Sequence, residues 1–317
     1  MPKTIASMPV RGSQHSSREE GAEAREQALV RKPALRREHR SVMSKEALAL
    51  LDLKNGDVVV DATYGQGGHS KLIKKTAKVK LITVDADPAS GADIAANFGD
   101  LEKVLAKSLP AGRRVNKVLF DLGWNIGQLD SGRGFSFLRD EPLNMSYGPA
   151  PRSGFTAAEV LNIWSEKAVA DALFGYGEER YARRIARRVV ERRAVQPFTS
   201  TIELAEVIKD AVPAAYRRGR LHPATKSFQA LRMAVNDELG ALDQGLKGAW
   251  NALGAGGRIV VITFHSIEDR AVKRLFASWA KAGDGKLVVK KPLIASMAEV
   301  KANPPSRSAK MRAIEKI

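Results

Sequence analysis

Short apolar runs, several of them rich in β-branched residues, recur along this chain between stretches that have the hydrophobic spacing of helices. The runs that we predict to be strands are 58–61, 81–84, 115–120 and 259–264, with 287–289 and 310–314 as a terminal hairpin. Buried parallel strands read as short apolar runs, and strands that alternate with helices indicate a parallel sheet. The pattern therefore predicts an α/β protein with a doubly wound sheet.

The pattern changes in the middle of the chain, where helical spacing continues from Phe155 to about Glu238. The helices expected there are 157–163, 168–174, 181–190, 202–212 and 228–239, and another at 41–53 leads into the first strand. We interpret the helical part as an insertion between consecutive strands. Because the first residues lack hydrophobic periodicity, we expect a disordered tail there. The expected domains are a basic tail over 1–38, a sheet domain over 39–134 and 240–317, and a substrate-binding helical insertion over 135–239.

A glycine-rich loop follows the first predicted strand. Asp61 ends the strand, and Gly65, Gly67 and Gly68 precede a polar run that can begin a helix. Glycines permit sharp turns and close approach of the backbone to a ligand, and open α/β sheets bind ligands at the carboxyl ends of their strands. The spacing differs from the dinucleotide fingerprint G-x-G-x-x-G and is similar to the first motif of methyltransferases that use S-adenosylmethionine. A glycine-rich turn in some other α/β protein is the alternative.

Two further strands are each predicted to end in an acid. Asp85 closes the second strand, at the place where a nucleoside-binding α/β fold puts an acid that accepts hydrogen bonds from ribose hydroxyls. A structural Asp that caps the next helix is the alternative. Asp121 closes the third strand, so the sequence predicts one crevice lined by strand ends.

Composition points to a polyanionic partner. The formal net charge is +17, which suggests nucleic acid or a ribosome, although a solvated basic surface would have the same charge. The absence of cysteine excludes disulfides and sites that bind metal through thiolates. No apolar run approaches the ~18 residues of a membrane span. We therefore expect a soluble cytoplasmic protein without a membrane partner. Its oligomeric state stays open, with a homodimer as one alternative.

Taken together, these residues resemble the ribosomal RNA small-subunit methyltransferase H family (RsmH, also called MraW). The match extends from about His39 to the end of the chain, and several of its strings are specific to the family. The matching segments are 61–70, 85–88, 120–123, 128–130, 133–137, 176–180, 222–225, 228–232, 264–270 and 303–308.

The resemblance implies a class I methyltransferase fold, Rossmann-like, with an inserted helical domain. It implies transfer of a methyl group from S-adenosylmethionine to N4 of a cytidine in 16S rRNA, in the decoding region of the small ribosomal subunit. The family's cofactor contacts, carried over by position, are Gly67, Gly68, His69, Asp85, Asp121 and Gln128. A further contact, usually aromatic in the family, falls near Leu109, where the alignment is loose.

The chain departs from the family at 124–127 and at 144–148, and both segments are expected to border the pocket for the base. Candidate hydrogen-bond acceptors for the cytosine amine are Asn125 and Asp140, besides backbone oxygens at 124–127. Trp124 offers an aromatic face for an unstacked base, unless it is a core residue. His265 and Asp269 lie just past a strand end, where they could also face the crevice, and a buried structural histidine bonded to the backbone is the alternative. The residues alone do not identify a general base.

A basic helix is expected in the insertion, where 178–232 contains 13 Lys or Arg residues against six acids. We predict that Arg183, Arg184, Arg187 and Arg188 contact RNA phosphates, whereas a solvated helix face is the alternative. An assembly or RNA-binding factor that keeps the cofactor fold but has weak or lost catalysis remains the second functional hypothesis. A nicotinamide-dependent dehydrogenase is a third, which the glycine spacing disfavours.

Overall fold

The computed structural model describes residues 40–123 and 126–317, without the side chains of 126 and 127. The tail expected over 1–38 lies outside the described residues. Within the described ranges, no helix combines the length and the apolar character needed to cross a membrane.

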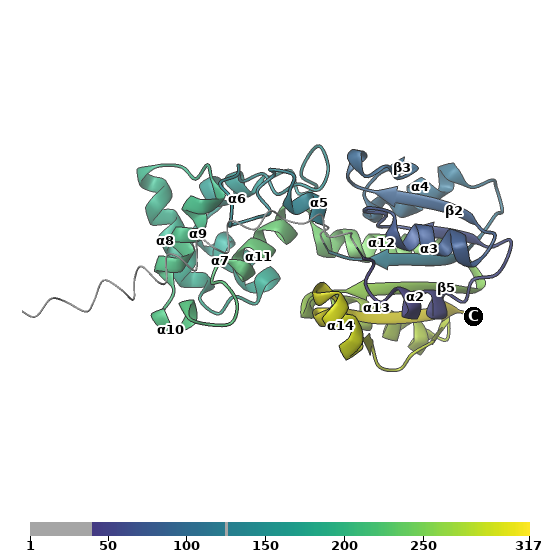
Figure 1. Cartoon of the computed structure of the whole chain (residues 1–317). Helices are drawn as coiled ribbons and strands as arrows, with labels where there is room; N and C mark the ends of the chain where they lie inside the picture. The colour runs from purple at the N-terminus through teal and green to yellow at the C-terminus, as the bar shows by residue number, and fades with distance from the viewer. Residues whose placement is uncertain (1–39, 124–125) are drawn as a thin grey trace, which may run out of the picture. The chain divides into compact units, whose positions relative to one another are not determined.

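The described residues form an eight-stranded sheet in which the order is β3-β2-β1-β4-β5-β8-β6, with β7 paired to β8 (Figure 1). The strands are β1 (Val58–Asp61), β2 (Lys80–Asp85), β3 (Ile94–Ala95), β4 (Val115–Asp121), β5 (Leu253–Thr263), β6 (Gly285–Leu287), β7 (Leu293–Ile294) and β8 (Lys310–Lys316). Strands β1 to β5 pair in parallel, and β8 runs antiparallel between β5 and β6. The predicted doubly wound α/β fold is confirmed.

The order of the strands reverses at β1, which pairs with β2 on one side and with β4 on the other. Val60 lies in register with Ile82 and with Val118 across these two pairings. Open α/β sheets bind their ligands at such a switch point, outside the carboxyl ends of the strands. Asp61, Asp85 and Asp121 are each the last residue of a strand at this edge.

Helices cover both faces of the sheet because the side chains of a strand alternate between its faces. On one face, Val60, Phe120 and Val261 pack against α4 (Leu101–Ser108), α12 (Glu238–Ala252) and α13 (Ser266–Ala282). On the other face, Val59 and Leu119 pack against α2 (Ser44–Leu51) and α3 (Gly68–Thr76). A strand buried on both faces is apolar throughout, which is why these runs could be identified in the sequence.

The helical part of the chain has a hydrophobic core of its own, whose buried members run from Phe135 to Val235. Its helices are α6 (Ala157–Ile163), α7 (Glu166–Gly177), α8 (Ala182–Val195), α9 (Thr201–Ala211), α10 (Ala214–Arg217) and α11 (Thr225–Val235). Three of them begin at hydroxyl caps, since Thr156, Ser165 and Ser200 accept hydrogen bonds from backbone N–H groups of the first turn. We call this part the insertion.

The connection from the insertion back to the sheet differs from the prediction of one helix over 228–239. Helix α11 ends at Val235, Asp237 has a left-handed φ of 44°, and α12 begins at Glu238. Asn236 lies at the break, where its amide donates to the carbonyl of Met145 and its side-chain oxygen accepts from the N–H of Tyr147. The two ends of the insertion therefore meet at Asn236.

Candidate active site

The loop after β1 is tied to the end of β4 by polar contacts of its own residues. Ser70 Oγ donates to the buried carboxylate of Asp61 at 2.6 Å, and burial raises the pKa of Asp61 above its usual range. Thr63 Oγ1 accepts a hydrogen bond from the N–H of Asp121 at 2.6 Å. Asp61 thus holds the loop in shape, whereas Thr63 joins two strand ends.

The glycines of this loop are required by the protein itself. Gly67 has a left-handed φ of 73°, and a Cβ there would come within 2.6 Å of the Tyr64 hydroxyl. A Cβ on Gly68 would overlap Ser41 Oγ. A side chain at either glycine would therefore clash with the loop's own surroundings. These glycines are thus needed for the fold of the loop, in addition to the close approach to a ligand that the sequence suggested. The loop leads into α3, and the N–H groups in the first turn of a helix have no acceptor within the helix.

Asp85 is held in place by two backbone donors. The N–H of Gly65 donates to Oδ2 at 2.7 Å, and the N–H of Asp87 donates to Oδ1 at 2.8 Å. Burial raises the pKa of Asp85, and these two hydrogen bonds oppose that shift. Because each carboxylate oxygen has a second lone pair, Asp85 can still accept hydrogen bonds from two adjacent hydroxyl groups.

Arg133 connects the insertion to this corner of the site. Its Nη2 donates to Asp87 Oδ2 at 2.8 Å, and its Nη1 donates to the carbonyl of Tyr147 at 2.8 Å. The carboxylate of Asp87 also caps the short helix that follows it. Asp87 therefore has the capping role that was an alternative for Asp85.

His69 and Asp121 each have a buried side-chain atom that lacks a hydrogen-bond partner within the described residues, and so has His265. His69 Nε2 lies 3.3 Å from Asp121 Oδ2 without forming a hydrogen bond, and Asp121 Oδ1 also has no partner within the described residues. Burial alone would lower the pKa of His69, but the Asp121 carboxylate outweighs it and raises this pKa. Buried polar atoms are rarely left unpaired, so this pair indicates a polar ligand. Gln128, in α5 (Ile126–Leu129), is buried.

The cofactor contact expected near Leu109 stays a prediction, and an aromatic residue of another element, Phe98, is a second candidate for it. Leu109 ends α4, where it packs against the core of the sheet. Phe98 lies after β3, packs edge-on against Phe120 at 5.9 Å between ring centroids, and lines a cavity at the strand ends. In the sequence, Phe98 could have been identified as the aromatic residue next to Asn97, just after the strand that follows Asp85.

This cavity has a volume of about 40 Å³ and lies where β1, β4, the insertion, α12 and α13 meet. Its lining residues are Thr63, Phe98, Leu122, Gly123, Tyr147, Glu238, Leu242 and Glu268. A single water needs about 10–15 Å³ by this measure, so the space admits a small polar group and not a whole ring. The lining combines apolar walls with two carboxylates and a phenol.

Glu238 is neutralised by a buried arginine. Arg232 Nε and Nη2 donate to its two oxygens at 2.7 and 3.0 Å, and the Tyr147 hydroxyl donates to Oε1 at 2.9 Å. Burial raises the pKa of Tyr147 well above its usual value, so the phenol stays protonated. No pattern in the sequence indicates this cluster, because Arg232 and Glu238 read as ordinary helix charges.

Glu268 stays ionised although it is buried. Burial would raise its pKa, but the His265 side chain and the N–H of Phe264 lower it below the usual range. Its Oε2 accepts from that N–H at 3.0 Å, and its Oε1 lies 3.0 Å from His265 Nε2. The cavity therefore contains one carboxylate whose charge is matched by Arg232 and another that is held as an anion by weaker donors.

Three of these groups could be taken for a metal site, since ligand atoms of Glu238, His265 and Glu268 lie within 4.8 Å of one another. However, Arg232 already supplies a cation to both oxygens of Glu238. His265 Nδ1 accepts from the N–H of Glu268, which leaves the ring proton on Nε2 in the neutral form. The arrangement fits an ion-pair network better than a set of metal ligands.

The other acids singled out in the sequence lie elsewhere. Asp140 is exposed on the insertion and does not line the cavity, and Asn125 lies outside the described residues. Asp269 pairs with Arg312 at 2.6 Å and with Lys310 at 3.3 Å, which lower its pKa against the effect of burial. Asp269 therefore fastens α13 to β8, whereas His265 faces Glu268.

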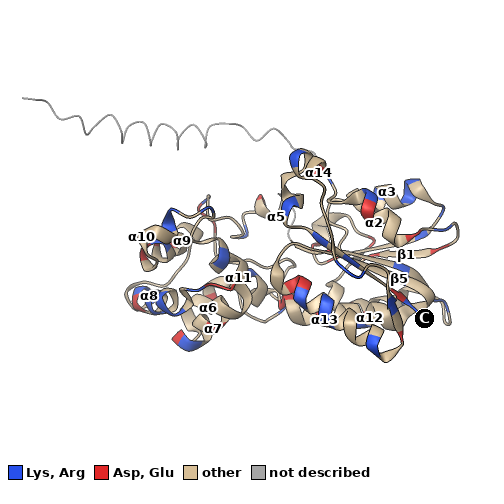
Figure 2. Ribbon diagram, turned by 90° about the horizontal axis from the view of Figure 1, so that it is seen from below, with Lys and Arg blue, Asp and Glu red and all other residues tan. Residues whose placement is uncertain are grey.

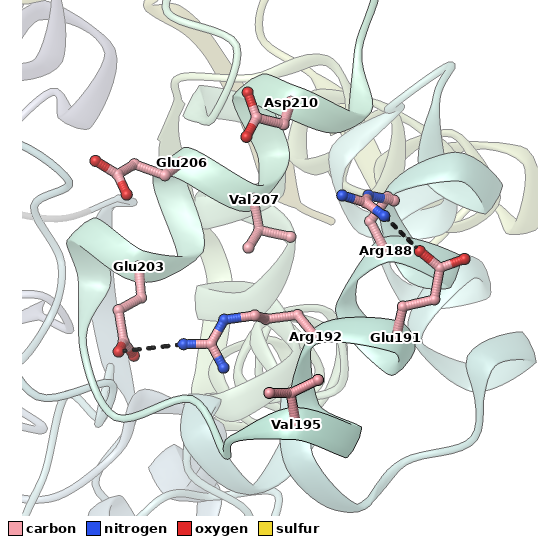
Figure 3. Close-up of a pocket in the computed structure, with 8 residues that line it drawn as sticks. All are labelled: Arg188, Glu191, Arg192, Val195, Glu203, Glu206, Val207 and Asp210. Carbon is pink, nitrogen blue, oxygen red and sulfur yellow. Dashed lines mark hydrogen bonds and ion pairs between the residues drawn. The ribbon is translucent and has the colours of Figure 1, made fainter.

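A larger cavity, of about 420 Å³, lies between α8 and α9 in the insertion (Figure 3). Its acids outnumber its arginines, and both arginines are paired, Arg188 with Glu191 at 2.7 Å and Arg192 with Glu203 at 3.6 Å. None of its lining residues comes from a strand end. This cavity therefore has no part in the chemistry of the crevice.

The arginines of α8 differ in how free they are. Arg183 and Arg184 are exposed and have no hydrogen bond or ion pair within the part of the chain that the structure describes. Arg187 lies 4.0 Å from Glu166, and Arg188 is paired with Glu191. Lys and Arg positions are coloured blue along α8 in the ribbon of Figure 2. Two of the four predicted phosphate contacts are therefore free to bind an anion, and two have competing acids.

Comparison with known proteins identifies the family. Ribosomal RNA small subunit methyltransferase H of Synechococcus elongatus is 44% identical over 293 residues, which cover 88% of this chain and 95% of that protein. The protein of the same name from Carboxydothermus hydrogenoformans is 44% identical over 310 residues, covering 88% and 98%. Among solved structures, an rRNA methylase from Streptococcus thermophilus superposes with a TM-score of 0.38 at 10% identity, covering 87% of this chain and 95% of that one.

The family model described as the MraW methylase family matches residues 36–317, which is nearly the whole chain. This match includes the strand-end acids, the glycine loop and the insertion. The predicted family, enzyme class and cofactor are thereby confirmed. The chain belongs to the MraW methylase family and is a methyltransferase that uses S-adenosylmethionine.

Proposed function

We propose that this protein methylates N4 of a cytidine in the decoding region of small-subunit ribosomal RNA. The relatives named as small-subunit rRNA methyltransferases support the substrate. The position of the base and of its reacting atom is our inference from the family and from the cavity. The observation that carries it is the cavity at the ends of β1 and β4, which admits an amino group beside an ionised carboxylate.

The residues of the strand ends fit S-adenosylmethionine. Asp85 would accept hydrogen bonds from the ribose hydroxyls, and the unpaired atoms of His69 and Asp121 would gain partners. Gly67, Gly68 and Gln128 stay proposed as further contacts, and Phe98 takes the place proposed for Leu109. When bound, the cofactor supplies a methyl group activated by its sulfonium. The protein's task is therefore to present the nitrogen in line with the S–CH3 bond.

We assign the acceptor for the cytosine amine to Glu268. The N4 lone pair is delocalised into the ring, so a hydrogen-bond acceptor on an N4 proton makes it more available. The nitrogen gives its electron pair to the new N–CH3 bond, the S–CH3 pair remains on sulfur, and the nitrogen releases one proton to Glu268. His265 Nε2, 3.0 Å from Glu268 and carrying the ring proton, stabilises this carboxylate as an anion until it accepts the proton.

Tyr147 and Glu238 complete this part of the site. The Tyr147 hydroxyl donates to Glu238, so its own oxygen is left to accept from the amine or a water. Tyr147 belongs to the segment 144–148 in which the chain departs from the family, so this departure lies at the cavity. Trp124 and Asn125, of the other departing segment, lie outside the described residues. Asn125 and Asp140 remain proposed as alternative acceptors.

The product tests the proposal. Small subunits that lack the modification are incubated with the protein and S-adenosylmethionine, and the RNA is digested to nucleosides for mass spectrometry. We expect N4-methylcytidine and no 5-methylcytidine, because methylation at C5 needs a thiolate that adds to C6, and the chain has no cysteine. Methyladenosine as the main product would contradict the assignment to cytidine. Bound cofactor without any product would favour the assembly factor instead.

Two variants locate the acceptor. Glu268→Gln keeps the volume and a capping group for α13, and it should lower single-turnover methyl transfer by about a hundredfold or more. Cofactor affinity, measured by calorimetry, should stay within about twofold. Asp140→Asn, assayed in parallel, should have the smaller effect. If Asp140→Asn is the slower enzyme, the acceptor lies on the insertion and not on α13.

A further inference from the structure

Two loops of the insertion meet on its surface through a pair of stacked rings. The ring of Phe137 stacks on the imidazole of His222 at 4.5 Å between centroids and 13° between planes. Phe228 of α11 packs edge-on against Phe137, with 5.2 Å between the ring centroids. The stack brings the segment after α5 next to the segment between α10 and α11, although these lie far apart in the sequence.

Large apolar side chains are exposed on both sides of this stack. Leu138 is 80% exposed, and Leu221 is 52% exposed. Each directly adjoins one of the stacked rings in the sequence, so both exposed side chains belong to the two short segments that the stack joins. We call Phe137, Leu138, Leu221 and His222 the stacking face. Exposed apolar side chains that cluster beside aromatic rings mark binding surfaces more often than single exposed leucines do.

The charges around the stacking face favour an anionic partner. Arg217, Arg218 and Arg220 are exposed and have no ion pair or side-chain hydrogen bond within the described residues. Arg139, on the other loop, is held by Asp130 at 2.7 Å. Burial and the nearby Lys209 lower the pKa of His222, so its ring stays neutral and remains a flat π surface. Free guanidinium groups beside such a surface match phosphates linked to flat bases.

We propose that the stacking face binds unpaired nucleotides of the RNA substrate. Bases would stack on the His222–Phe137 pair and its flanking leucines, while Arg217, Arg218 and Arg220 would neutralise the adjacent phosphates. A protein partner would find apolar contact here, but it would leave three neighbouring arginines without counter-charges. This inference rests on the proposed function only in taking RNA as the substrate, and it places the target's flanking single strand on the insertion.

Binding of RNA to the full chain tests the proposal directly. A fluorescent single-stranded RNA of about 16 nucleotides is titrated with protein across a range of salt concentrations, and anisotropy gives the affinity. Leu138→Ser with Leu221→Ser should weaken binding about fivefold to a hundredfold at every salt concentration, because the bases would cover the apolar surface of both leucines. Replacing Arg217, Arg218 and Arg220 with Gln should lower the slope of log K against log salt by about 2.

Matched controls are available elsewhere in the chain. Phe174 is 66% exposed on α7, so Phe174→Ser removes an exposed apolar group away from the stack. Lys103, Lys107 and Arg113 are exposed in the sheet domain, and their replacement with Gln removes three charges. RNA affinity and salt slope that respond equally to test and control variants would overturn the proposal. Weaker RNA binding by the test variants alone would support it, even if the methylated product proved not to be N4-methylcytidine.

Discussion

His69 on α3 and Asp121 at the end of β4 approach within 3.3 Å, so a buried imidazole and a carboxylate share one charge pair across the switch point of the sheet. The carboxylate raises the pKa of His69 above its ordinary value of 6.5, although burial opposes this. A group whose pKa is raised by folding stabilises the fold below its unfolded pKa. That stabilisation is lost as the pH rises through the folded pKa.

The first prediction concerns stability without cofactor. The free energy of unfolding should contain a contribution from protonated His69 that is complete below a pH of about 6.5 and disappears above the raised pKa. Asp121→Asn should remove this contribution and flatten the profile in that range. Urea unfolding at several pH values measures it for both proteins. A profile of the same slope in Asp121→Asn would show that another group titrates.

The second prediction concerns the ribose acceptor. Asp85→Ala should weaken binding of S-adenosylmethionine about tenfold to a hundredfold, because a charged hydrogen bond is worth ~1.5–3 kcal/mol. The substitution also leaves the N–H groups of Gly65 and Asp87 without their acceptor, so some loss of stability is expected. Calorimetry on folded protein separates the two effects. Unchanged affinity would remove Asp85 from the cofactor site.

A third prediction distinguishes Phe98 from Leu109. Phe98→Leu keeps an apolar residue at the cavity but removes the flat ring, so cofactor affinity should fall several-fold. Leu109→Val alters only packing against the core of the sheet and should leave cofactor affinity unchanged. Parallel calorimetric titrations measure both. The opposite ranking would return the contact to the position that alignment with the family indicates.

A fourth prediction separates the free arginines of α8 from the paired ones. Arg183→Gln with Arg184→Gln should lower the dependence of log K for RNA on log salt by about 1 to 2, since each phosphate contact contributes ~0.7 to 0.9. Arg188→Gln should change the slope less, because Glu191 already holds that side chain at 2.7 Å. Anisotropy titrations with the RNA described above give the slopes. Equal slopes in all three proteins would make α8 a solvated face.

The sheet and the strand-end acids of the candidate site could be predicted because their signals are local. A buried strand must be apolar along its whole length, and the residue at its carboxyl end reaches the crevice, so Asp85 and Asp121 could be placed from the sequence. The break at Asp237 could not, because a left-handed conformation in a residue other than glycine leaves no mark in the helical pattern. One expected helix is therefore two.

The cavity at the strand ends could not be predicted from the sequence, because its lining residues come from distant parts of the chain. Tyr147, Glu238 and Glu268 belong to the insertion, α12 and α13 in turn, and no spacing in the sequence relates them. A charged residue is usually exposed, so the buried pair of Arg232 and Glu238 looked like surface charge. Asp269 was likewise a candidate to face the crevice, whereas its carboxylate pairs with Arg312 of the last strand.

The joint at Asn236 has a consequence for how such a chain can be built. The Asn236 side chain forms hydrogen bonds with the backbone of Met145 and Tyr147, near the start of the insertion. Asn236 itself lies where the insertion ends. The two segments that connect the sheet domain to the helices are therefore joined to each other at Asn236, whatever the number of residues between them. Closing a longer loop costs only slightly more entropy. Helices could thus be lengthened, exchanged or removed beyond this point over evolutionary time, while the strand ends proposed to bind the cofactor kept their places.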